Sequence, residues 1–363
     1  MTFTISEIAA ALGAECAGEV DIRVMRASEP SVAQQGDLAL AMDRSYVDAL
    51  SQGNAVAAVL WPGADWQAMG LKAAIFVNRP RFAMAGITAK FDRLPEIAQG
   101  IHETAVINPT ADIGAGVSVG AFTVIGARAK IGMNSQIMSQ VTIAEDAELG
   151  GDALVYSGVR IGSSVQIGAR FIAHYNSVVG SDGFSFVTPE PSGAEEARRD
   201  FKTSGKVKHQ AYARIASNAS VVIGDDVELG ASATIDKGTI ASTQIGSGSK
   251  IDNHVQVGHN VKIGEHCLLC AHAAVAGSTV LGDRVILGGQ AGVGDHLVLG
   301  DDVIAAGATA ILSNVPAGRV MMGYPAMKME TNIEAYKALR RLPRLVAKFG
   351  DLQKQVSRLI DKS

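Results

Sequence analysis

Residues 245–311 read IGSGSKIDNHVQVGHNVKIGEHCLLCAHAAVAGSTVLGDRVILGGQAGVGDHLVLGDDVIAAGATAI, and an aliphatic residue occupies every sixth position. Eleven of these twelve positions hold Val, Ile or Leu, and one holds Ala. They are Ile245, Ile251, Val257, Ile263, Leu269, Val275, Leu281, Leu287, Val293, Leu299, Ala305 and Ile311. A repeat sustained over this length indicates the fold of the whole segment.

A period of six fits neither an amphipathic helix nor an alternating strand, and it is typical of a parallel β-helix built from hexapeptides. Each hexapeptide forms one short strand and one turn, and three hexapeptides close a triangular coil. Residues 18 positions apart in this sequence then lie one above the other, at the strand spacing of about 4.8 Å. We expect the aliphatic side chains to fill the interior, so that polar residues occupy the corners.

The same period begins at Ile107, runs to Val179 and resumes at Ile223. Residues 181–213 carry Gly, Pro, Ser and mixed charge, which makes them too polar for the interior of the coil. We therefore expect a long excursion there, and excursions of this length are usually functional. A later slip of the period predicts a small corner loop around residues 237–242.

Residues 1–100 do not follow the period and predict a small α/β domain. We expect a helix over residues 6–12, capped by Ser6, because Ser is a common helix N-cap. Residues 55–60 and 73–77 are typical of strands, and residues 81–91 of a helix that follows a proline. The β-helix domain should then occupy residues 101–326.

The coil should end at residues 314–318, and residues 323–326 should turn the chain into a helical extension over residues 327–363. An apolar stripe follows helical spacings in this extension, at Leu345, Phe349, Leu352, Val356 and Leu359. The stripe is short and needs partners, so it predicts a homotrimer assembled with the flat faces of a triangular coil.

Basic residues also gather in the extension, at Lys337, Arg340, Arg341, Arg344 and Lys348. They are either a solvated helix face or a docking surface for an acidic partner. We expect docking to involve Arg340, Arg341 and Arg344.

Composition narrows the classes of function. The 363 residues carry a formal net charge of −4, which gives no general preference for nucleic acid or a membrane surface. Residues 1–18 lack a basic segment followed by an apolar one, so we expect no signal peptide. No run of 18 apolar residues occurs, and the three cysteines have no disulfide spacing. These features predict a cytoplasmic protein. Cys267 and Cys270 form a C-x-x-C that we interpret as structural, because it lies inside the hexapeptide register.

Five of the eight histidines fall within the later repeats, at His254, His259, His266, His272 and His296. His259 and His296 are 37 positions apart, which is two coils plus one residue, so they should project from nearly the same edge. Gly277 is one coil beyond His259 and should leave open space over its imidazole. A neighbouring carboxylate could orient His259 as a general base. The His254 and His259 spacing also suits zinc, but the third histidine of such a site is missing from the preceding coils.

Nearly all of the chain resembles the UDP-3-O-(3-hydroxyacyl)glucosamine N-acyltransferases of lipid A (lipopolysaccharide) biosynthesis. The most specific matches are Gly180-Ser181-Asp182-Gly183-Phe184, Thr234-Ile235-Asp236-Lys237-Gly238, and Ile251-Asp252-Asn253 leading to His259-Asn260. The resemblance implies an N-terminal uridine-binding domain, a left-handed parallel β-helix and a C-terminal helical extension.

The resemblance also implies roles for single residues. His259 corresponds to the catalytic base, the backbone amide of Gly277 to the oxyanion donor, and His296 to a substrate contact. Residues near the acceptor and the acyl chain correspond to Asp252, Gln256 and Asn260. The uridine site corresponds to Tyr46, which is retained, and to Leu40 and Asp43, which replace an aromatic residue and an amide.

The implied reaction moves a 3-hydroxyacyl chain from acyl carrier protein to the 2-amino group of a UDP-linked, 3-O-acylated glucosamine. No metal or bound cofactor is expected, because phosphopantetheine arrives on the carrier protein. Two other interpretations remain open from the residues. A coenzyme A dependent acetyltransferase would explain the coil but not the N-terminal domain, and a purely structural β-helix would explain neither the histidines nor the basic extension.

Overall fold

The computed structural model describes residues 2–93, 95, 97–193, 195, 209–323 and 326–360. The chain divides into two compact units, Met1–Glu96 and Ile97–Ser363. The division falls earlier than the expected boundary at residue 100 because the residues around it already bond to the coil. Gly100 accepts a backbone hydrogen bond from Val119 at 2.9 Å, and Ile101 bridges to the same residue.

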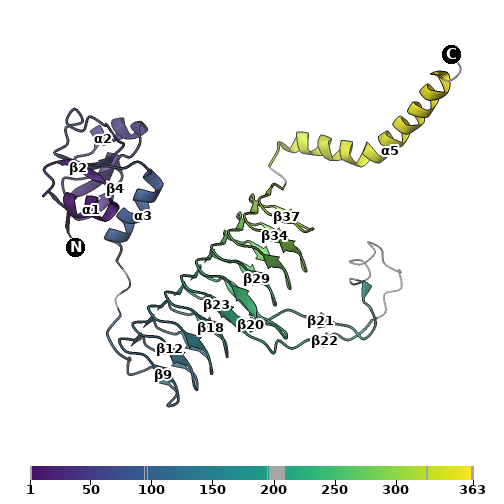
Figure 1. Ribbon diagram of the computed structural model, residues 1–363, viewed down its shortest axis with the longest axis horizontal. Coiled ribbons are helices and arrows are strands. Elements are labelled where there is room, and N and C mark those ends of the chain that lie inside the picture. The colour runs from purple at the N-terminus through teal and green to yellow at the C-terminus, as the bar shows by residue number, and fades with distance from the viewer. Residues whose placement is uncertain are drawn as a thin grey trace. The chain divides into compact units, whose positions relative to one another are not determined.

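The N-terminal unit is an α/β fold with a five-stranded sheet in the order β2-β7-β6-β5-β4 (Figure 1). The strands β4 to β7 run parallel, and β2 is antiparallel to β7. The sheet strands are β2 (Glu15–Gly18), β4 (Arg26–Ser28), β5 (Asp37–Leu40), β6 (Ala57–Leu60) and β7 (Ala73–Phe76), and β1 (Phe3–Thr4) pairs with β3 (Arg23–Val24). The helices are α1 (Ile5–Leu12), η1 (Pro30–Val32), η2 (Arg44–Tyr46), α2 (Val47–Gln52) and α3 (Pro80–Phe91).

The expected helix at residue 6 begins one residue earlier, and its cap is Thr4 and not Ser6. Thr4 Oγ1 accepts from the Glu7 backbone N–H at 3.1 Å, and Glu7 Oε2 accepts from the Thr4 N–H at 2.8 Å. This reciprocal capping box satisfies two N–H groups that the helix itself leaves unpaired. Ser6 cannot cap α1 because it already lies inside the helix.

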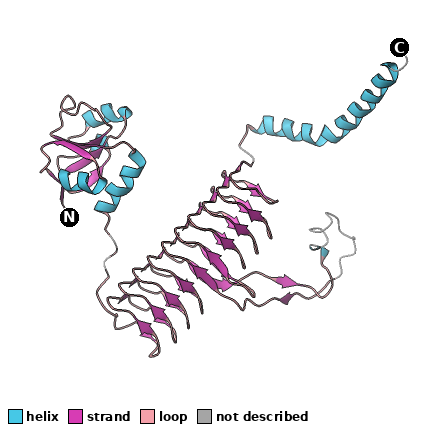
Figure 2. Ribbon diagram, viewed as in Figure 1, coloured by secondary structure: helices cyan, strands magenta, loops and turns pink. Residues whose placement is uncertain are grey.

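The second unit is a parallel β-helix whose short strands stack into three sheets (Figure 2). Sheet 1 contains β10 (Ser118–Val119), β13 (Gln136–Ile137), β16 (Leu154–Val155), β19 (Ile172–Ala173), β24 (Glu228–Leu229), β27 (Lys250–Ile251), β30 (Leu268–Leu269), β33 (Ile286–Leu287), β36 (Ile304–Ala305) and β38 (Val320–Met321). Sheet 2 contains β8 (Val106–Ile107), β11 (Val124–Ile125), β14 (Thr142–Ile143), β17 (Arg160–Ile161), β20 (Val178–Asp182), β25 (Thr234–Lys237), β28 (Gln256–Val257), β31 (Ala274–Val275), β34 (Gly292–Val293) and β37 (Ala310–Ile311). Sheet 3 contains β9 (Asp112–Ile113), β12 (Lys130–Ile131), β15 (Glu148–Leu149), β18 (Gln166–Ile167), β23 (Val221–Ile223), β26 (Thr243–Ile245), β29 (Lys262–Ile263), β32 (Val280–Leu281) and β35 (Val298–Leu299).

The register confirms the sequence period. Val257 pairs with Val275, and Val275 pairs with Val293, so residues 18 apart are neighbours in adjacent turns. These side chains are at most 4% exposed and belong to one continuous buried column. The interior of the coil is therefore filled by the aliphatic position of the repeat.

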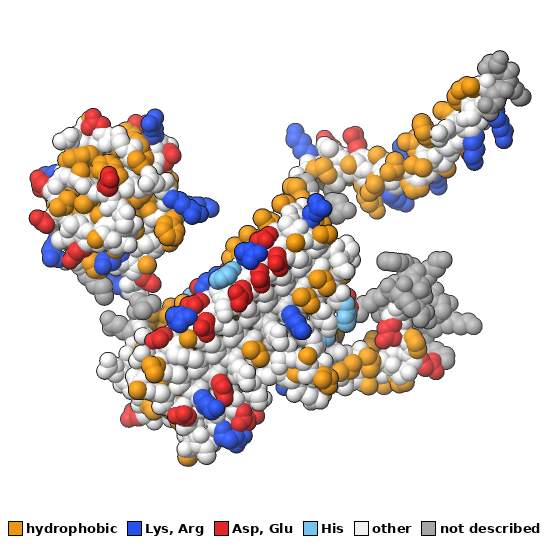
Figure 3. All heavy atoms as spheres, in the orientation of Figure 1, with side chains coloured by type: hydrophobic (Ala, Val, Ile, Leu, Met, Phe, Trp, Pro, Cys, Tyr) orange, Lys and Arg blue, Asp and Glu red, His pale blue; other side chains and the backbone are white. Residues whose placement is uncertain are grey.

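Each corner of the coil needs a residue with a left-handed backbone, and these residues are often not glycine. Asn260 has φ 60° and His296 has φ 58°. Such backbones cost a non-glycine residue on the order of 1 kcal/mol, so they persist because the stacked turns impose them. Stacking also aligns corner side chains into ladders, such as the 2.7 Å pair of Arg284 with Asp302 one turn on. Figure 3 shows acidic, basic and histidine side chains in a row along the coil.

The two expected interruptions are present. The excursion leaves the coil after β20 and returns at β23, and it carries the antiparallel pair β21 (Phe186–Val187) and β22 (Ala213–Arg214). The corner loop occupies residues 238–242, between β25 and β26. Both lie on the part of the coil that holds His259, because β20 pairs with β25 and β25 pairs with β28.

The coil ends slightly later than expected, because β38 adds a strand to sheet 1 after residue 318. Two residues of the expected turn, Tyr324 and Pro325, lie outside the described part of the chain. The extension is a single helix, α5 (Met329–Ile360), which contains Pro343 and bends along its length in Figure 1. Proline removes one helix hydrogen bond and clashes with the preceding turn, which explains a bend. None of the described helices is long and apolar enough to cross a bilayer.

Candidate active site

A hollow of about 660 Å³ lies on the outer face of sheet 2, where β25, β28, β31, β34 and β37 follow one another. Its walls combine polar groups at one end with small apolar residues along the sheet. The lining residues are Asp182, Phe184, Asp236, Gln256, Gly258, His259, Ala274, Val275, Ala276, Gly277, Gly292, Val293, Gly294, Ala310 and Leu312. The excursion thus contributes directly to the hollow that contains His259.

His259 is oriented by the side chain of the next residue. Its Nδ1 lies 2.9 Å from Asn260 Oδ1, and Asn260 Nδ2 donates to the Ala241 carbonyl at 2.7 Å. Because the amide nitrogen is used there, Oδ1 faces the ring and can only accept, so Nδ1 carries the proton. His259 Nε2 is then the basic nitrogen. We expected a carboxylate in this role, and the structure has an amide instead.

The corner loop fixes Asn260 in turn. Thr239 donates to Asn260 Oδ1 from its backbone N–H at 3.2 Å and from its hydroxyl at 3.0 Å. The Thr243 hydroxyl accepts from the Asn260 N–H at 2.9 Å. The slip in the repeat therefore has a local purpose, because it supplies the polar groups that hold the partner of His259.

Gly277 lies directly against the imidazole of His259, one turn along the coil as the period predicts. A Cβ on Gly277 would lie 2.7 Å from Cε1 and 2.8 Å from Nε2 of His259. Real Cβ atoms do not approach that closely, so a side chain at this position would displace the ring. The missing side chain leaves the backbone beside the basic nitrogen open to a ligand.

Asp236 is a nearly buried carboxylate in the same hollow, with 9% of its surface exposed. Ser181 Oγ donates to its Oδ1 at 2.6 Å, and Gln256 Nε2 donates to its Oδ2 at 3.0 Å. Burial raises the pKa of Asp236, whereas these two hydrogen bonds and the charge of His259 act to lower it.

Asp182 shares the hollow but has a different electrostatic setting. It pairs with Lys237 at 3.0 Å and with Arg214 of β22, which donates a close hydrogen bond. Hydrogen bonding to Lys237 is the main reason that the pKa of Asp182 is lowered. The charge of Asp182 is thus balanced by Arg214 and Lys237, and the two ion pairs connect β22 of the excursion to β25.

His296 lies at the same corner as His259, two turns further along, as expected. It follows β34, which is in register with β28 through β31, and its backbone N–H donates to the Gly277 carbonyl at 3.1 Å. His296 occupies the left-handed corner position, which is the position of Asn260 and not that of His259. The two imidazoles therefore flank one edge but do not stack.

Asp252 lies at a different corner from His259 within one chain. It follows β27 of sheet 1 and borders a separate hollow of about 480 Å³ that also contains His174 and Glu228. Its carboxylate accepts from the Ala271 N–H at 2.9 Å. The structure thus does not bring Asp252 to His259, whereas Gln256 and Asn260 do lie beside His259.

The clustered histidines of the sequence are also divided among corners. The ring of His254 stacks on that of His272, with centroids 4.9 Å apart, at the corner that follows sheet 1. His266 lies at a third corner, the one that follows β29 of sheet 3. The His254 and His259 spacing that suits zinc is therefore split between two edges. Within the described ranges, no three His, Cys, Asp or Glu side chains converge as a metal site would require.

The two cysteines of the C-x-x-C have different settings, because Cys270 is half-buried and borders the hollow that contains Asp252. Cys267 is buried inside the coil, and its Sγ lies 3.2 Å from the Gly282 carbonyl. Burial raises the pKa of the Cys267 thiol, which disfavours the reactive thiolate. Cys16, Cys267 and Cys270 are all unpaired.

Comparison with known proteins identifies the family. Two hexapeptide families match the coil, the bacterial transferase hexapeptide (six repeats) over residues 242–277 and the hexapeptide repeat of succinyl-transferase over residues 220–258. The UDP-3-O-acylglucosamine N-acyltransferase of Ruegeria pomeroyi is 64% identical over 358 residues, which are 99% of each chain. The chain belongs to the UDP-3-O-acylglucosamine N-acyltransferase family. It is therefore an acyltransferase.

Other comparisons agree with this assignment. The UDP-3-O-acylglucosamine N-acyltransferase of Paracoccus denitrificans is 59% identical over 362 residues, covering 100% of this chain and 99% of that protein. The Arabidopsis UDP-N-acetylglucosamine acyltransferase structure matches with a TM-score of 0.51 and 23% identity, covering 61% of this chain and 71% of that one. That likeness concerns the fold alone, which is the expected left-handed hexapeptide β-helix.

In the N-terminal unit of this acyltransferase, the three residues expected at a uridine site share one loop after β5. Leu40 ends β5, Asp43 caps η2, and Tyr46 ends η2 with 46% of its surface exposed. Asp43 Oδ1 accepts from the Ser45 hydroxyl at 2.6 Å and from its N–H at 2.9 Å, and these bonds lower the pKa of Asp43. One carboxylate oxygen therefore maintains the turn.

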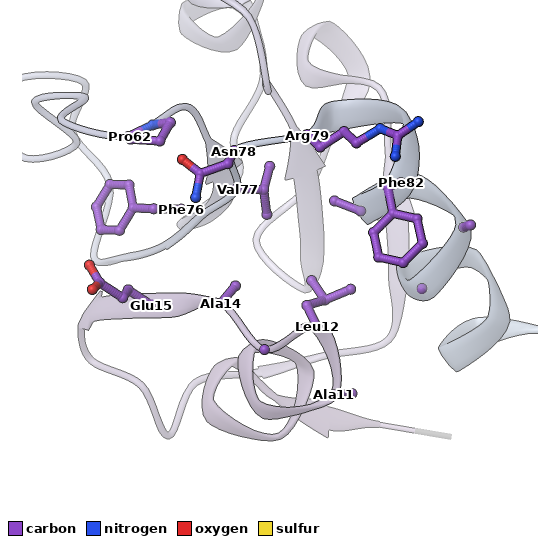
Figure 4. A pocket seen from close by; sticks show the side chains of 14 residues that line it. Ala11, Leu12, Ala14, Glu15, Pro62, Phe76, Val77, Asn78, Arg79 and Phe82 are labelled. Carbon is purple, nitrogen blue, oxygen red and sulfur yellow. The ribbon is translucent and has the colours of Figure 1, made fainter.

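A hollow of about 650 Å³ in the same unit lies between α1, β7 and α3, and Leu40, Asp43 and Tyr46 do not border it (Figure 4). Arg79 and Phe82 lie side by side at its rim, with Leu12 facing them from α1. The guanidinium of Arg79 lies 5.9 Å from the ring centroid of Phe82. The sequence reasoning missed this hollow, although Asn78-Arg79-Pro80 directly after a strand was a possible signal.

The extension presents both expected surfaces on α5. Arg340, Arg341 and Arg344 are exposed, and Arg340 lies over the ring of Tyr336 at 5.9 Å. The apolar stripe is also exposed, with Phe349 at 67% and Leu359 at 70%. No side chain of α5 is buried among the described residues, so the apolar stripe is not covered by other residues of the same chain.

Three polar or aromatic groups at the hollow were not singled out by the sequence as site residues, Asp182, Phe184 and Asp236. All three fall in motifs that carried the family resemblance, but only the folded chain brings them to His259. The available signal was that one motif, residues 180–184, comes just before the excursion and another, residues 234–238, comes after it.

Proposed function

We propose that this acyltransferase moves a 3-hydroxyacyl chain from acyl carrier protein to the 2-amino group of UDP-3-O-acylglucosamine. The observation that carries the proposal is His259, whose Nε2 is left basic by Asn260 beside the open backbone of Gly277. An ammonium cannot attack a thioester, so a base placed at the reacting carbonyl is what amide formation requires.

In this reaction His259 Nε2 takes the proton of the amine as nitrogen attacks the thioester carbonyl. The carbonyl oxygen becomes negative, and the Gly277 N–H donates to it. Collapse of the tetrahedral intermediate expels the phosphopantetheine thiolate, which takes a proton from the imidazolium, and leaves the amide. This chemistry uses no metal or resident cofactor.

The hollow also suits an acyl chain. Beyond His259, the outer face of sheet 2 carries only small side chains, Ala274, Gly292 and Ala310, and the hollow ends at Leu312. Leu312 is 82% exposed. A hydrocarbon chain lying on this face would cover apolar surface at about 25 cal/mol per Å².

Docking of the carrier protein is proposed to use the basic face of α5. Arg341, Arg344 and Lys348 follow spacings of three and four residues, so they lie on one side of the helix. Changing Arg340, Arg341 and Arg344 together to Glu should raise KM for acyl carrier protein at least tenfold, because charge attraction becomes repulsion. The KM for the sugar nucleotide should barely change.

Steady-state kinetics with acyl carrier protein and UDP-3-O-acylglucosamine check this expectation. The difference in KM for acyl carrier protein between the wild type and this variant should shrink as salt is raised, because exposed charges are screened. Equal increases in both KM values would contradict docking at α5 and indicate a damaged fold. Faster turnover of acetyl-coenzyme A than of acyl carrier protein would favour the alternative acetyltransferase.

The uridine moiety is proposed to bind the loop after β5. The exposed ring of Tyr46 offers a stacking surface, and the second oxygen of Asp43 can accept from the N3–H of uracil. Tyr46→Ala should weaken UDP binding about tenfold in calorimetry, because stacking on an aromatic ring is worth roughly 1–3 kcal/mol per base. Phe82→Ala is the matched control, since Phe82 is an exposed aromatic at the hollow between α1, β7 and α3, away from Tyr46. Weaker binding in the Phe82 variant alone would move the uridine site to that hollow.

A homotrimer is proposed for the assembly. Sheet 1 exposes Leu268, Ile304 and Val320 on its outer face, and α5 exposes its apolar stripe. A threefold arrangement could bring the Asp252 corner of one copy towards the His259 corner of another, which one chain cannot do. Multi-angle light scattering at micromolar concentration should give three times the chain mass of 37.7 kDa. A monomeric mass would contradict the assembly.

The cytoplasm is proposed as the location of the enzyme. The three unpaired cysteines support a reducing compartment.

A further inference from the structure

Asp236 is the most conspicuous ionisable group that the reaction above leaves without a role. It is nearly buried, it borders the hollow of His259, and both of its oxygens accept hydrogen bonds. Burial raises the pKa of Asp236, and the donors on both oxygens oppose this rise by favouring the carboxylate over the neutral acid. Holding an anion away from water is costly, so a positive charge is expected nearby.

The charges around Asp236 are unevenly distributed. Asp182 has two cations, Lys237 and Arg214, but Asp236 forms no ion pair with a lysine or arginine among the described residues. The pairing of Ile235 with Val257 puts Asp236 of β25 beside the corner that follows β28, and His259 lies in that corner. His259 is therefore the cationic partner available to Asp236, once the ring is protonated.

The geometry also shows how the carboxylate is held. Ser181 is opposite Asp236 in the register of β20 and β25, at the bulge where the excursion starts. Two residues later, Gly183 packs against His259, where a Cβ would lie 2.6 Å from the Cβ of His259. The short segment from Ser181 to Gly183 therefore hydrogen-bonds to Asp236 at one end and packs against His259 at the other.

We propose that Asp236 is a positioning residue that stabilises the positive charge which His259 acquires on taking the proton of the amine. This inference rests on the proposed function of His259 as the base. On this proposal Asp236 acts through the imidazolium and takes no proton from the amine itself. Asp182 on β20 is the other ionisable group that borders the hollow, and it is paired with Lys237 on β25 and Arg214 on β22. Asp295 and His296 occupy the same corner two turns further along.

The proposal can be tested on the full-length enzyme without substrate. Histidine labelled with ¹³C at Cε1 allows His259 to be titrated by NMR, with its signal assigned from His259→Ala. In Asp236→Asn the midpoint of this titration should fall by about one pH unit, the usual effect of an adjacent opposite charge. The sign follows because a less stabilised imidazolium loses its proton at lower pH. Asp236→Glu keeps the charge and should restore most of the midpoint.

Asp112→Asn is the matched control, because it removes the same charge from an exposed strand residue, β9, elsewhere on the coil. Its His259 midpoint should equal that of the wild type. If Asp236→Asn does not fold, the wild-type protein still decides. The ¹³Cγ signal of Asp236 should then show an inflection at the His259 midpoint. An unchanged midpoint in folded Asp236→Asn, or no inflection in the wild type, would overturn the proposal.

Activity supplies a second measurement. The acidic limb of the kcat/KM profile in Asp236→Asn should move to lower pH by the same interval, with kcat on the plateau about tenfold lower, the equivalent of one pH unit. A shifted NMR midpoint in an enzyme that transfers no 3-hydroxyacyl chain from acyl carrier protein to UDP-3-O-acylglucosamine would separate the two proposals. In that case the proposed function fails, while the coupling of Asp236 to His259 stands. A loss of kcat with an unshifted pH profile would assign Asp236 a purely structural role.

Discussion

His259→Ala is expected to lower kcat by about 10²–10⁴, the usual contribution of a positioned general base. This corresponds to about 2.7–5.4 kcal/mol of transition-state stabilisation. The physical reason is that Asn260 leaves Nε2 as the only basic nitrogen of the ring, next to Gly277. The measurement is steady-state kcat at saturating acyl carrier protein and sugar nucleotide.

His296→Ala is the matched comparison, because His296 lies at the same edge two turns further along but in the corner position of Asn260. It should chiefly raise KM for the sugar nucleotide and leave most of kcat. Both variants must first show the wild-type melting temperature and assembly mass. If His296→Ala loses kcat while His259→Ala keeps it, the two histidines have exchanged roles and the proposed mechanism is wrong.

Gly277→Ala is expected to lower kcat at least a hundredfold with little loss of stability. The added Cβ would lie 2.7 Å from the His259 ring, so the imidazole must leave its hydrogen bond to Asn260. The same methyl group would also obstruct the approach of the thioester oxygen to the Gly277 N–H. Losing one oxyanion donor alone typically costs 10²–10³ in kcat.

Gly289→Ala provides the control for this substitution. Gly289 occupies the same place in its turn, two residues after a strand and just before a left-handed residue, and its Cβ would meet nothing nearer than the Ala271 carbonyl at 3.5 Å. This variant should retain wild-type kcat. Comparable losses in both variants would mean that any side chain in the turn damages the coil, and Gly277 would then have no special role.

The sequence was sufficient for everything that follows from the period. The column of Val257, Val275 and Val293 and the position of Gly277 beside His259 both come from counting in steps of 18. The same counting also separates Asp252 from His259, because seven residues are one strand and one corner. The sequence therefore contained that distinction, although the family motifs placed the two residues together.

The rest depends on the places where the period fails. The partner of His259 is Asn260, which is held by a loop whose path no repeat specifies. The setting of Asp236 requires Ser181, which lies 55 residues earlier and returns only because the chain re-enters the same turn after the excursion. Such contacts depend on three-dimensional closure and leave little trace in a local pattern.

The position of the site within the stack affects how the molecule tolerates partial unfolding. In a linear array each turn is stabilised mainly by its two neighbours, so fraying starts at the terminal turns and moves inward. The turn of His259 begins at β28, with β31, β34 and β37 beyond it and six strands of sheet 2 before it. His259 and Gly277, the proposed catalytic groups, therefore lie inside the stack and not at a fraying end, and amide exchange should be slower around them than in the terminal turns. Loosening of the first or last turns would then leave the chemistry intact until several turns had melted.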